Sequence, residues 1–138
     1  MRASYTHLFS DEHGISHFEE VETELLPGFA VPPAEPLHFA EFVHGGRCRW
    51  VGGNPDWKGD APHPVPRRML VIPIQGAFEI TAGDGIARQF KPGDVVIAED
   101  TWGSGHATRM IGDIDCITLF IELEDIPPER LASTRPIV

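Results

Sequence analysis

The segment that decides the fold is Pro62–His106, PHPVPRRMLVIPIQGAFEITAGDGIARQFKPGDVVIAEDTWGSGH. Its almost unbroken apolar run, Met69–Gln75, is too short for a stable helix and ends at Gly76, a pattern typical of a strand covered on both faces. Phe78 and Ile80 then alternate with more polar neighbours, which is the period of a half-buried strand. Two successive strands joined at a glycine indicate a β protein.

The rest of the segment alternates short apolar runs with turns. Gly83–Gly85 contains Asp-Gly, which tolerates the positive φ of a hairpin turn, and Lys91–Asp94 contains Pro-Gly, which also favours a turn. The runs between and after these turns predict strands at Ile86–Phe90, at Val95–Ala98 and from His106 onward. The segment therefore predicts a meander of five short strands.

The spacing resembles the first of the two conserved motifs of the cupin family. That motif is Gly, five residues, His-x-His, three or four residues, Glu, six residues and Gly. Counted back from Gly76, the glycine, the two histidine and the glutamate positions hold Trp57, His63, Val65 and Met69. Only one of the family's three metal ligands in this motif is therefore matched.

The second cupin motif is matched by Gly93-Asp94 and, after a longer loop, by His106. The family pattern Pro-x-Gly-x-x-His is represented by Glu99–His106, which is about four residues longer. The PRR segment and the E-D-T-x-G-x-G-H loop also resemble a group of small bacterial cupins. The resemblance covers residues 57 to about 110 and implies an all-β fold, the cupin or jelly-roll antiparallel β-barrel, with degenerate metal motifs.

Length and composition fit one small β-rich domain. The 138 residues predict a single domain, 1–138, with a core at about 37–123, an N-terminal arm at 1–36 and a C-terminal tail at 124–138. With 13 prolines and 14 glycines, the chain has the many turns of an all-β fold. The formal net charge of −10 argues against nucleic acid and anionic membrane as partners.

No apolar run approaches the roughly 20 residues that span a bilayer, and the first residues lack the apolar centre of a secretory signal. We therefore expect a cytoplasmic protein. In that compartment Cys48 and Cys116, each on an apolar strand, are expected to be buried free thiols.

Outside the central segment the chain reads mainly as strands. Phe18–Leu26 is acidic and fits an edge strand, with a short helix as the alternative. Leu37–Val43 and Arg47–Val51 predict strands, and Ile114–Leu123 is the clearest strand of all. The proline-rich stretch Gly52–Pro66 reads as a long loop, which is either functional or a plain rim of the barrel.

Strand alternation gives a candidate pocket. If His63 faces the interior, residues two apart from it do too. The predicted lining is His63, Val65, Arg67 and Met69, with His106, Thr108 and Met110 on the facing strand. An inward Arg67 needs a carboxylate, from Asp100, Glu79 or the substrate. The alternative is that Arg67 and Arg68 are a solvated surface pair.

A divalent metal is possible at the two histidines. Stable sites need three or four ligands, and imidazoles with one carboxylate suit zinc or ferrous iron. The candidate ligands are His63 and His106, completed by His38, Glu41 or His44, and by Asp100. The alternative is a pocket without a metal, in which the histidines form hydrogen bonds.

The loop Asp100–Gly105 would cap the pocket mouth. Asp100 can orient the imidazole of His106, the pairing that a general base needs, or can bond backbone amides in an ordinary turn. Trp57 and Trp102 can wall the pocket or pack at the rim. The remaining histidines, His7, His13 and His17, read as solvent-exposed.

These features lead to two functional hypotheses. The first is an enzyme acting on a small organic acid or carbonyl compound, with His63, His106, Arg67 and Asp100 as catalytic residues. The second is a non-enzymatic ligand-binding or sensor protein. The fold leaves the substrate and the reaction open. We also expect a homodimer, because small cupins of this size resemble one another in dimerising and because an N-terminal strand and the apolar last strand are available for pairing.

Overall fold

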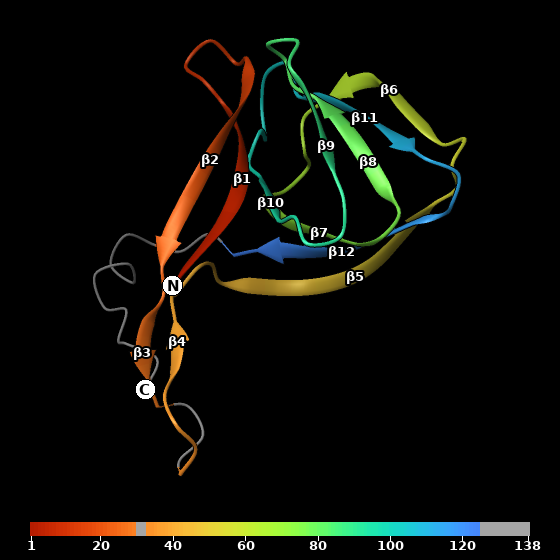
Figure 1. Ribbon diagram of the computed structural model, residues 1–138. Helices are drawn as coiled ribbons and strands as arrows, with labels where there is room; N and C mark the ends of the chain where they lie inside the picture. Colours follow the sequence, from red (N-terminus) through yellow and green to blue (C-terminus); the bar gives the residue numbers. More distant parts are fainter. Residues whose placement is uncertain (30–32, 125–138) are drawn as a thin grey trace.

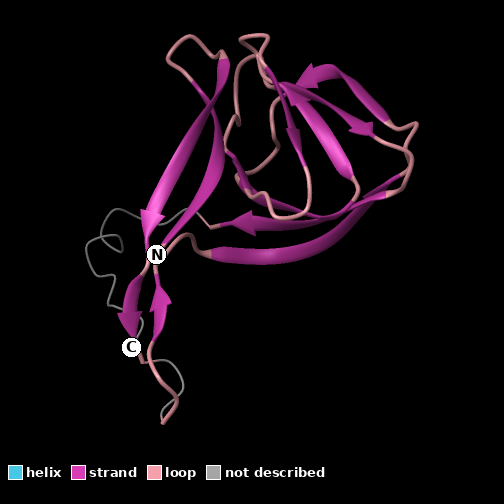
Figure 2. Ribbon diagram, in the orientation of Figure 1, coloured by secondary structure: helices cyan, strands magenta, loops and turns pink. Residues whose placement is uncertain are grey.

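The computed structural model describes residues 1–29 and 33–124, and every regular element in them is a strand (Figure 2). The N-terminal strands are β1 (Arg2–Ser10), β2 (Ser16–Glu24), β3 (Leu26–Gly28), β4 (Leu37–Phe39), β5 (Gly45–Gly53) and β6 (Lys58–His63). The others are β7 (Met69–Gln75), β8 (Ala77–Thr81), β9 (Ala87–Phe90), β10 (Val96–Ala98), β11 (His106–Ile111) and β12 (Cys116–Leu123). The all-β prediction is confirmed. The expected C-terminal tail lies, after Glu124, outside the described residues.

The strands form two main sheets that face each other (Figure 1). The six-stranded sheet has the order β2-β1-β10-β7-β12-β5, and the four-stranded sheet has the order β6-β11-β8-β9. All pairs are antiparallel except β1 with β10. Within the described part of the chain the strands do not close into one barrel, so the architecture is a two-sheet sandwich.

The predicted meander is wrong, although its strands are present. β7 and β10 pair with each other in the six-stranded sheet, while β8, β9 and β11 belong to the four-stranded sheet. The chain thus crosses between the sheets from β7 to β8, from β9 to β10 and from β10 to β11, whereas β8 and β9 pair directly. Periodicity indicates which face of a strand is buried, but not which strand it pairs with, because pairing depends on contacts distant in sequence.

The core lies between the two sheets. It is built from buried residues of both inner faces, among them Leu8 (β1), Val71 (β7), Phe78 (β8), Phe90 (β9) and Val96 (β10). Leu8 is completely buried and β1 pairs with β10. The expectation that residues 1–36 form an arm outside the core is therefore wrong for β1 and β2.

Several element boundaries differ from those predicted. β2 is an edge strand, as expected for its acidic sequence, whereas only Leu37–Phe39 of the predicted strand 37–43 is regular. β6 forms inside the predicted loop Gly52–Pro66, because its partner β11 supplies the hydrogen bonds that its composition did not indicate. β12 pairs with both β7 and β5, so the last strand is interior to its sheet and not free to pair elsewhere.

The outer face of the six-stranded sheet is only partly covered. A small second apolar cluster of Leu70, Ile97 and Leu123 lies there under Val43 and Tyr5. The hairpin of β3 and β4 projects away from the sandwich (Figure 1). Its Leu26 and Leu37 side chains are exposed, as is Trp50 on β5. These apolar surfaces leave room for another molecule to pack.

Candidate functional site

A cavity of about 450 Å³ lies between the sheets. This is within the usual size of small-molecule sites. Its walls are mostly apolar and come from β5, β7, β8, β10, β11 and β12; they include Val51, Met69, Val71, Phe78, Ile80, Val96, Met110 and Phe120. The polar groups in the lining are few: Arg49, His63, His106, Thr108, Thr118 and Glu122. Of the predicted lining residues, His63, Val65, Met69, His106, Thr108 and Met110 are present.

The two histidines expected from the cupin-like spacing meet in the lining of this cavity. His63 ends β6, His106 begins β11, and the two residues are register partners with ring centroids 5.5 Å apart. Gly105 permits this approach. It has φ of +65°, and a Cβ there would lie 2.0 Å from the carbonyl carbon of His63. Only glycine fits both the backbone conformation and the space.

Asp100 holds the ring of His106 from behind. The Nδ1 atom of His106 lies 2.5 Å from Oδ2 of Asp100, whose side chain is fully buried. A carboxylate can only accept, so Nδ1–H of His106 donates to Asp100, which orients the ring and leaves Nε2 as the remaining nitrogen. No hydrogen bond of Nε2 is present among residues 1–29 and 33–124. The predicted orienting role of Asp100 agrees with this geometry.

His63 is the more exposed partner. Its Nδ1 lies 3.0 Å from the backbone carbonyl of Pro64, which can only accept. The neutral ring therefore carries its proton on Nδ1 and has a lone pair on Nε2. With His106 in the same tautomer, the pair can bind or share a proton in the lining of an apolar cavity.

The candidate third metal ligands do not join this pair. His38 lies on β4, and Glu41 and His44 lie in the segment that follows; all three are exposed and outside the cavity lining. In the part of the chain that the structure describes, no three His, Cys, Asp or Glu side chains come close enough to hold an ion. Two imidazoles are one protein ligand short of the usual minimum for zinc, so the described side chains alone do not complete a metal site here.

Arg67 is not in the cavity, which corrects the predicted lining. Its side chain is 74% exposed. The prediction extended strand alternation from His63 to Met69, but residues 64–68 are not in a strand. Pro64 and Pro66 lack the N–H groups that a ladder needs, and the chain bends there.

The carboxylates considered for an inward Arg67, Asp100 and Glu79, contact other residues. Glu79 pairs with Arg109 at 2.9 Å, and Asp100 is occupied by His106. Arg68 instead contacts Glu99 at 2.8 Å. His7 and Arg68 together lower the pKa of Glu99 from 4.5 to about 2, with the contact to His7 the larger cause.

The cationic group in the cavity lining is Arg49, which sequence reasoning missed. Its Nη2 donates to Oε1 of Glu122 at 2.7 Å, from the neighbouring strand β12. The guanidinium groups of Arg49 and then Arg47 hold the pKa of Glu122 below its usual range. One signal was available: Glu122 is the single acidic residue within Cys116–Leu123.

Trp57 lines the cavity, whereas Trp102 packs elsewhere. The ring of Trp102 lies against Gly14, in the turn between β1 and β2. This turn fixes the loop that carries His106. Ser104 N–H donates to the Gly14 carbonyl at 2.7 Å, and Ser10 donates to the Trp102 carbonyl at 2.8 Å. The glycine-containing loop is therefore tightly held.

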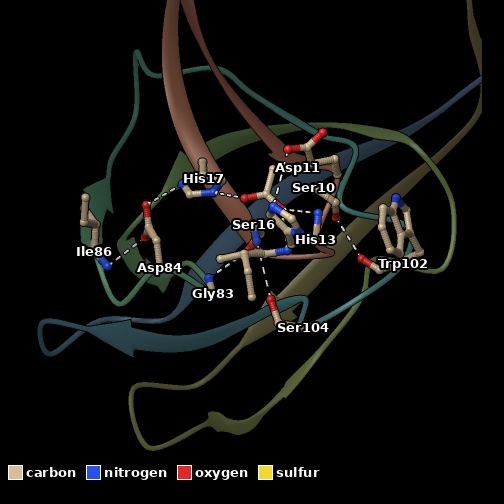
Figure 3. Close-up of polar contacts among 12 residues, drawn as sticks. Ser10, Asp11, His13, Ser16, His17, Gly83, Asp84, Ile86, Trp102 and Ser104 are labelled. Atoms are coloured by element: carbon tan, nitrogen blue, oxygen red, sulfur yellow. Dashed lines mark hydrogen bonds and ion pairs between the residues drawn. The ribbon is translucent and has the colours of Figure 1, made fainter.

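A polar clasp ties the β1–β2 turn to the cavity loop and to the β8–β9 turn (Figure 3). Buried Ser16 donates to the Gly105 carbonyl at 2.6 Å and accepts from Gly83 N–H at 2.6 Å. His17 bridges Asp11 at 2.6 Å and Asp84 at 3.0 Å. We refer to this set, Asp11, Ser16, His17, Gly83 and Asp84, as the clasp.

The clasp and its neighbours correct the expectation that all three N-terminal histidines are exposed. His13 is exposed, but the side chains of His7 and His17 are only 21% and 34% exposed. The carboxylates around them raise both pKa values, chiefly Glu99 for His7 and Asp11 for His17. The hydrogen bond from His17 lowers the pKa of Asp11.

The cysteines are both unpaired, as expected. Cys116 is buried beside Thr118, but Cys48 is exposed on the edge strand β5, contrary to the prediction that it is buried.

The described residues contain no helix long and apolar enough to cross a membrane. Neither a protein-family model nor the sequence of a curated protein matches this chain. The fold and the cavity therefore define the class: an all-β, two-sheet protein with an internal site.

Proposed function

We propose that this chain is a cupin-like enzyme that transfers a proton on a small organic acid or carbonyl compound bound in the cavity. The observation that carries the proposal is the His106–Asp100 pair, in which a fully buried carboxylate lies 2.5 Å from Nδ1 of a cavity-lining imidazole. The cupin resemblance of residues 57–110 supports it, together with the position of His63 and His106 in the cavity lining.

The chemistry follows from the tautomer. Nε2 of His106 accepts a proton from a carbon next to the carbonyl of the ligand, and the resulting imidazolium is stabilised by Asp100. The same nitrogen, or a water beside the more exposed His63, returns a proton to the ligand. The apolar walls exclude bulk water and strengthen the electrostatic interactions with the reacting groups.

The experiment is a hydrogen–deuterium exchange assay. Wild-type protein is incubated in deuterium oxide with a panel of 2-oxo acids, hydroxy acids and ketones, and proton NMR follows loss of the C–H signal next to the carbonyl. We expect exchange for at least one member of the panel, and its loss in His106→Gln. Exchange that persists in this variant would contradict the proposed base.

The second candidate function is a binding or sensor protein without catalysis. The predominantly apolar lining of the cavity favours it, because such walls bind a ligand without needing to react with it. A panel member that raises the melting temperature of the protein but shows neither exchange nor product would identify this function.

The metal alternative, zinc or iron at His63 and His106, is proposed only with ligand or water atoms completing the coordination. Metal analysis of purified protein tests it, with His63→Ala and His106→Ala as variants. Loss of a stoichiometric metal from both would support it, since neither variant leaves enough protein ligands.

We propose that the protein is a homodimer. The support is the exposed apolar surface: Trp50 is 69% exposed on β5, and Leu26 and Leu37 on the projecting hairpin are 61% and 57% exposed. Large exposed apolar side chains of this kind are found at association sites. Light scattering at micromolar concentration should give the dimer mass, and Trp50→Glu should shift it toward the monomer. A monomer mass for the wild type would overturn the proposal.

The cytoplasm is the proposed location, and a small molecule is the proposed ligand. Two unpaired cysteines, one of them exposed, suit a reducing compartment. Fractionation of the native cells tests the location.

A further inference from the structure

Three arginine side chains converge on the carboxylate of Glu122. Arg49 and Arg47 donate to its Oε1 at 2.7 Å and 2.9 Å, and Nη1 of Arg67 lies 4.0 Å from Oε2. We call these four residues the arginine cluster. Within the described chain no other ion pair of the three arginines is present.

The arginine cluster lies at the boundary between the cavity and the surface. Arg47 and Arg49 are two apart on β5, so their side chains leave the strand on the same face. Arg49 and Glu122 line the cavity, in the same lining as the histidines. Arg47, Arg67 and Glu122 line an adjoining polar hollow. Glu122 belongs to both, so the cluster connects the cavity to the solvent side.

The charge of the cluster is unbalanced. Three guanidinium groups share one carboxylate, which leaves two net positive charges in a chain whose formal net charge is −10. Among the described residues the hollow has one further carboxylate, Glu124, and one further arginine, Arg68, so an excess of positive charge remains. The side chains of Arg47, Arg49 and Arg67 are 64%, 54% and 74% exposed, respectively. Ion pairs of such exposed side chains add little to the stability of the fold. Folding stability therefore does not account for the group.

The wall between the arginine cluster and the histidines is apolar. Val71, Phe120 and Met110 belong to the same lining as Arg49 and His106. A ligand that fills this space has an anionic end, an apolar body and a polar group at the histidine end. A small dicarboxylate lacks the apolar body, and a plain hydrocarbon lacks both ends.

We propose that the arginine cluster, with Arg49 as its inner member, is the carboxylate-binding end of the site, and that the ligand class is an apolar carboxylic acid of aryl or branched alkyl type. This inference rests on the proposed function and names the ligand class for that site. Arginine suits the task because its planar guanidinium can bind a carboxylate through two parallel hydrogen bonds.

Glu122 holds the arginines in place before the ligand arrives. Its lowered pKa keeps it anionic at neutral pH, so it orients Arg49 and Arg47. The ligand carboxylate then offsets the excess positive charge and accepts hydrogen bonds from N–H groups of Arg49 that Glu122 does not occupy. In this account Glu122 is a positioning residue, and Arg49 is a binding residue.

The test is calorimetry with three probes at low ionic strength. Phenylacetate has the carboxylate and the apolar body, 2-phenylethanol has a similar body without charge, and succinate has two charges without the body. We expect phenylacetate to bind most tightly. Arg49→Met should weaken phenylacetate about 10- to 100-fold, the range for a hydrogen bond to a charged group, and leave 2-phenylethanol unchanged. Arg49→Lys should fall between, because it keeps the charge but loses the paired donors.

Arg109→Met is the matched control. Arg109 is 53% exposed and pairs with a single carboxylate at 2.9 Å, much as Arg49 does, but it does not line the cavity. The Arg109→Met protein should bind phenylacetate with the affinity of the wild type. A circular dichroism spectrum and a melting curve for each variant verify that the fold is retained.

The outcomes separate the two proposals. Equal affinities for phenylacetate and 2-phenylethanol, or an Arg49→Met protein with wild-type affinity for phenylacetate, would overturn the anion site and leave the cavity function standing. Tighter binding of succinate than phenylacetate would overturn the ligand class. Failure of all three probes to bind, together with no exchange for any compound in the NMR panel, would overturn both proposals.

Discussion

Among the histidines that contact carboxylates, His106 and His17 differ in how many of their ring nitrogens remain free. His106 in the cavity contacts Asp100 through Nδ1 only, whereas His17 in the clasp contacts Asp84 through Nδ1 and Asp11 through Nε2. A ring with both nitrogens occupied has no atom left for a ligand. A ring held at one nitrogen and lining a cavity has one. The number of free ring nitrogens, more than the presence of a carboxylate, therefore separates a candidate catalytic histidine from a structural one.

The largest expected difference between the two sites is in activity. His106→Gln should lower the exchange rate about 10²- to 10⁴-fold, the usual contribution of a general base. His17→Gln should leave the rate within about a factor of two when both are assayed well below their melting temperatures. Deuterium-exchange kinetics measure both. Equal losses in the two variants would remove the distinction.

Asp100→Asn sharpens the same comparison. The amide can donate to Nδ1 of His106, which would move the ring proton to Nε2 and remove the base. We expect a rate loss close to that of His106→Gln, with ligand affinity in calorimetry changed much less. A variant with full activity would show that Asp100 does not select the tautomer.

The next largest effect is on stability, at the glycine where the clasp meets the cavity. In Gly105→Ala the new Cβ would meet the backbone of His63 and Pro64, at a φ of +65°. Positive φ alone costs about 1–2 kcal/mol, and the backbone overlap should raise the loss of unfolding free energy to about 3 kcal/mol or more. Chemical denaturation measures it.

Gly85→Ala is the control for this substitution. Gly85 has φ of +87° but open space around it, so only the conformational cost of about 1–2 kcal/mol is expected. If both variants lose the same stability, the close approach of Gly105 to His63 has no energetic consequence.

Acid should weaken the loop that leads into Asp100. The pKa of Glu99 is lowered to about 2, chiefly by His7 and then by Arg68. A carboxylate with a lowered pKa stabilises the folded state above about pH 4.5, and this stabilisation is lost as the pH falls toward 2. At pH 6 we expect the unfolding free energy of Glu99→Gln to be about 1 kcal/mol below that of the wild type, a value discounted for the solvent that reaches this half-buried group. At pH 2.5 the difference between the two proteins should be close to zero. Urea unfolding at the two pH values tests this.

The clasp should respond to pH in the opposite direction. The pKa of His17 is raised, chiefly by Asp11, so its contribution is present below about 6.5, the usual value of histidine, and is lost as pH rises through the folded-state pKa. The melting-temperature difference between wild type and His17→Gln should therefore be larger at pH 5.5 than at pH 9. A difference that grows toward pH 9 would mean that His17 is neutral in the folded protein.

Much of the local structure was predictable, because it depends on short-range patterns. The apolar run at β7, the alternation in β8 and the Asp-Gly and Pro-Gly turns all appear at the expected positions. The contact of Asp100 with His106 was also within reach of the sequence, since only six positions separate the two residues.

Several of the predictions that failed crossed a break in regular structure or a long distance in sequence. Arg67 was placed inside by alternation across two prolines, where alternation does not hold. The Arg49–Glu122 pair joins residues 73 positions apart, and no local pattern indicates it. β6 was not predicted because it lies within the proline-rich stretch Gly52–Pro66, whose composition resembles a loop, and only its pairing with β11 shows that it is a strand.

The all-β class and most strand positions follow from the sequence alone, and the contact of Asp100 with His106 was one of two alternatives that the sequence left open. The tertiary structure decided which sheet each strand joins, which arginine reaches the cavity and which histidines keep a free nitrogen. The physical reason is the range of the interactions. Side-chain period and turn geometry are set by neighbouring residues, whereas strand pairing and charge contacts depend on segments that only folding brings together.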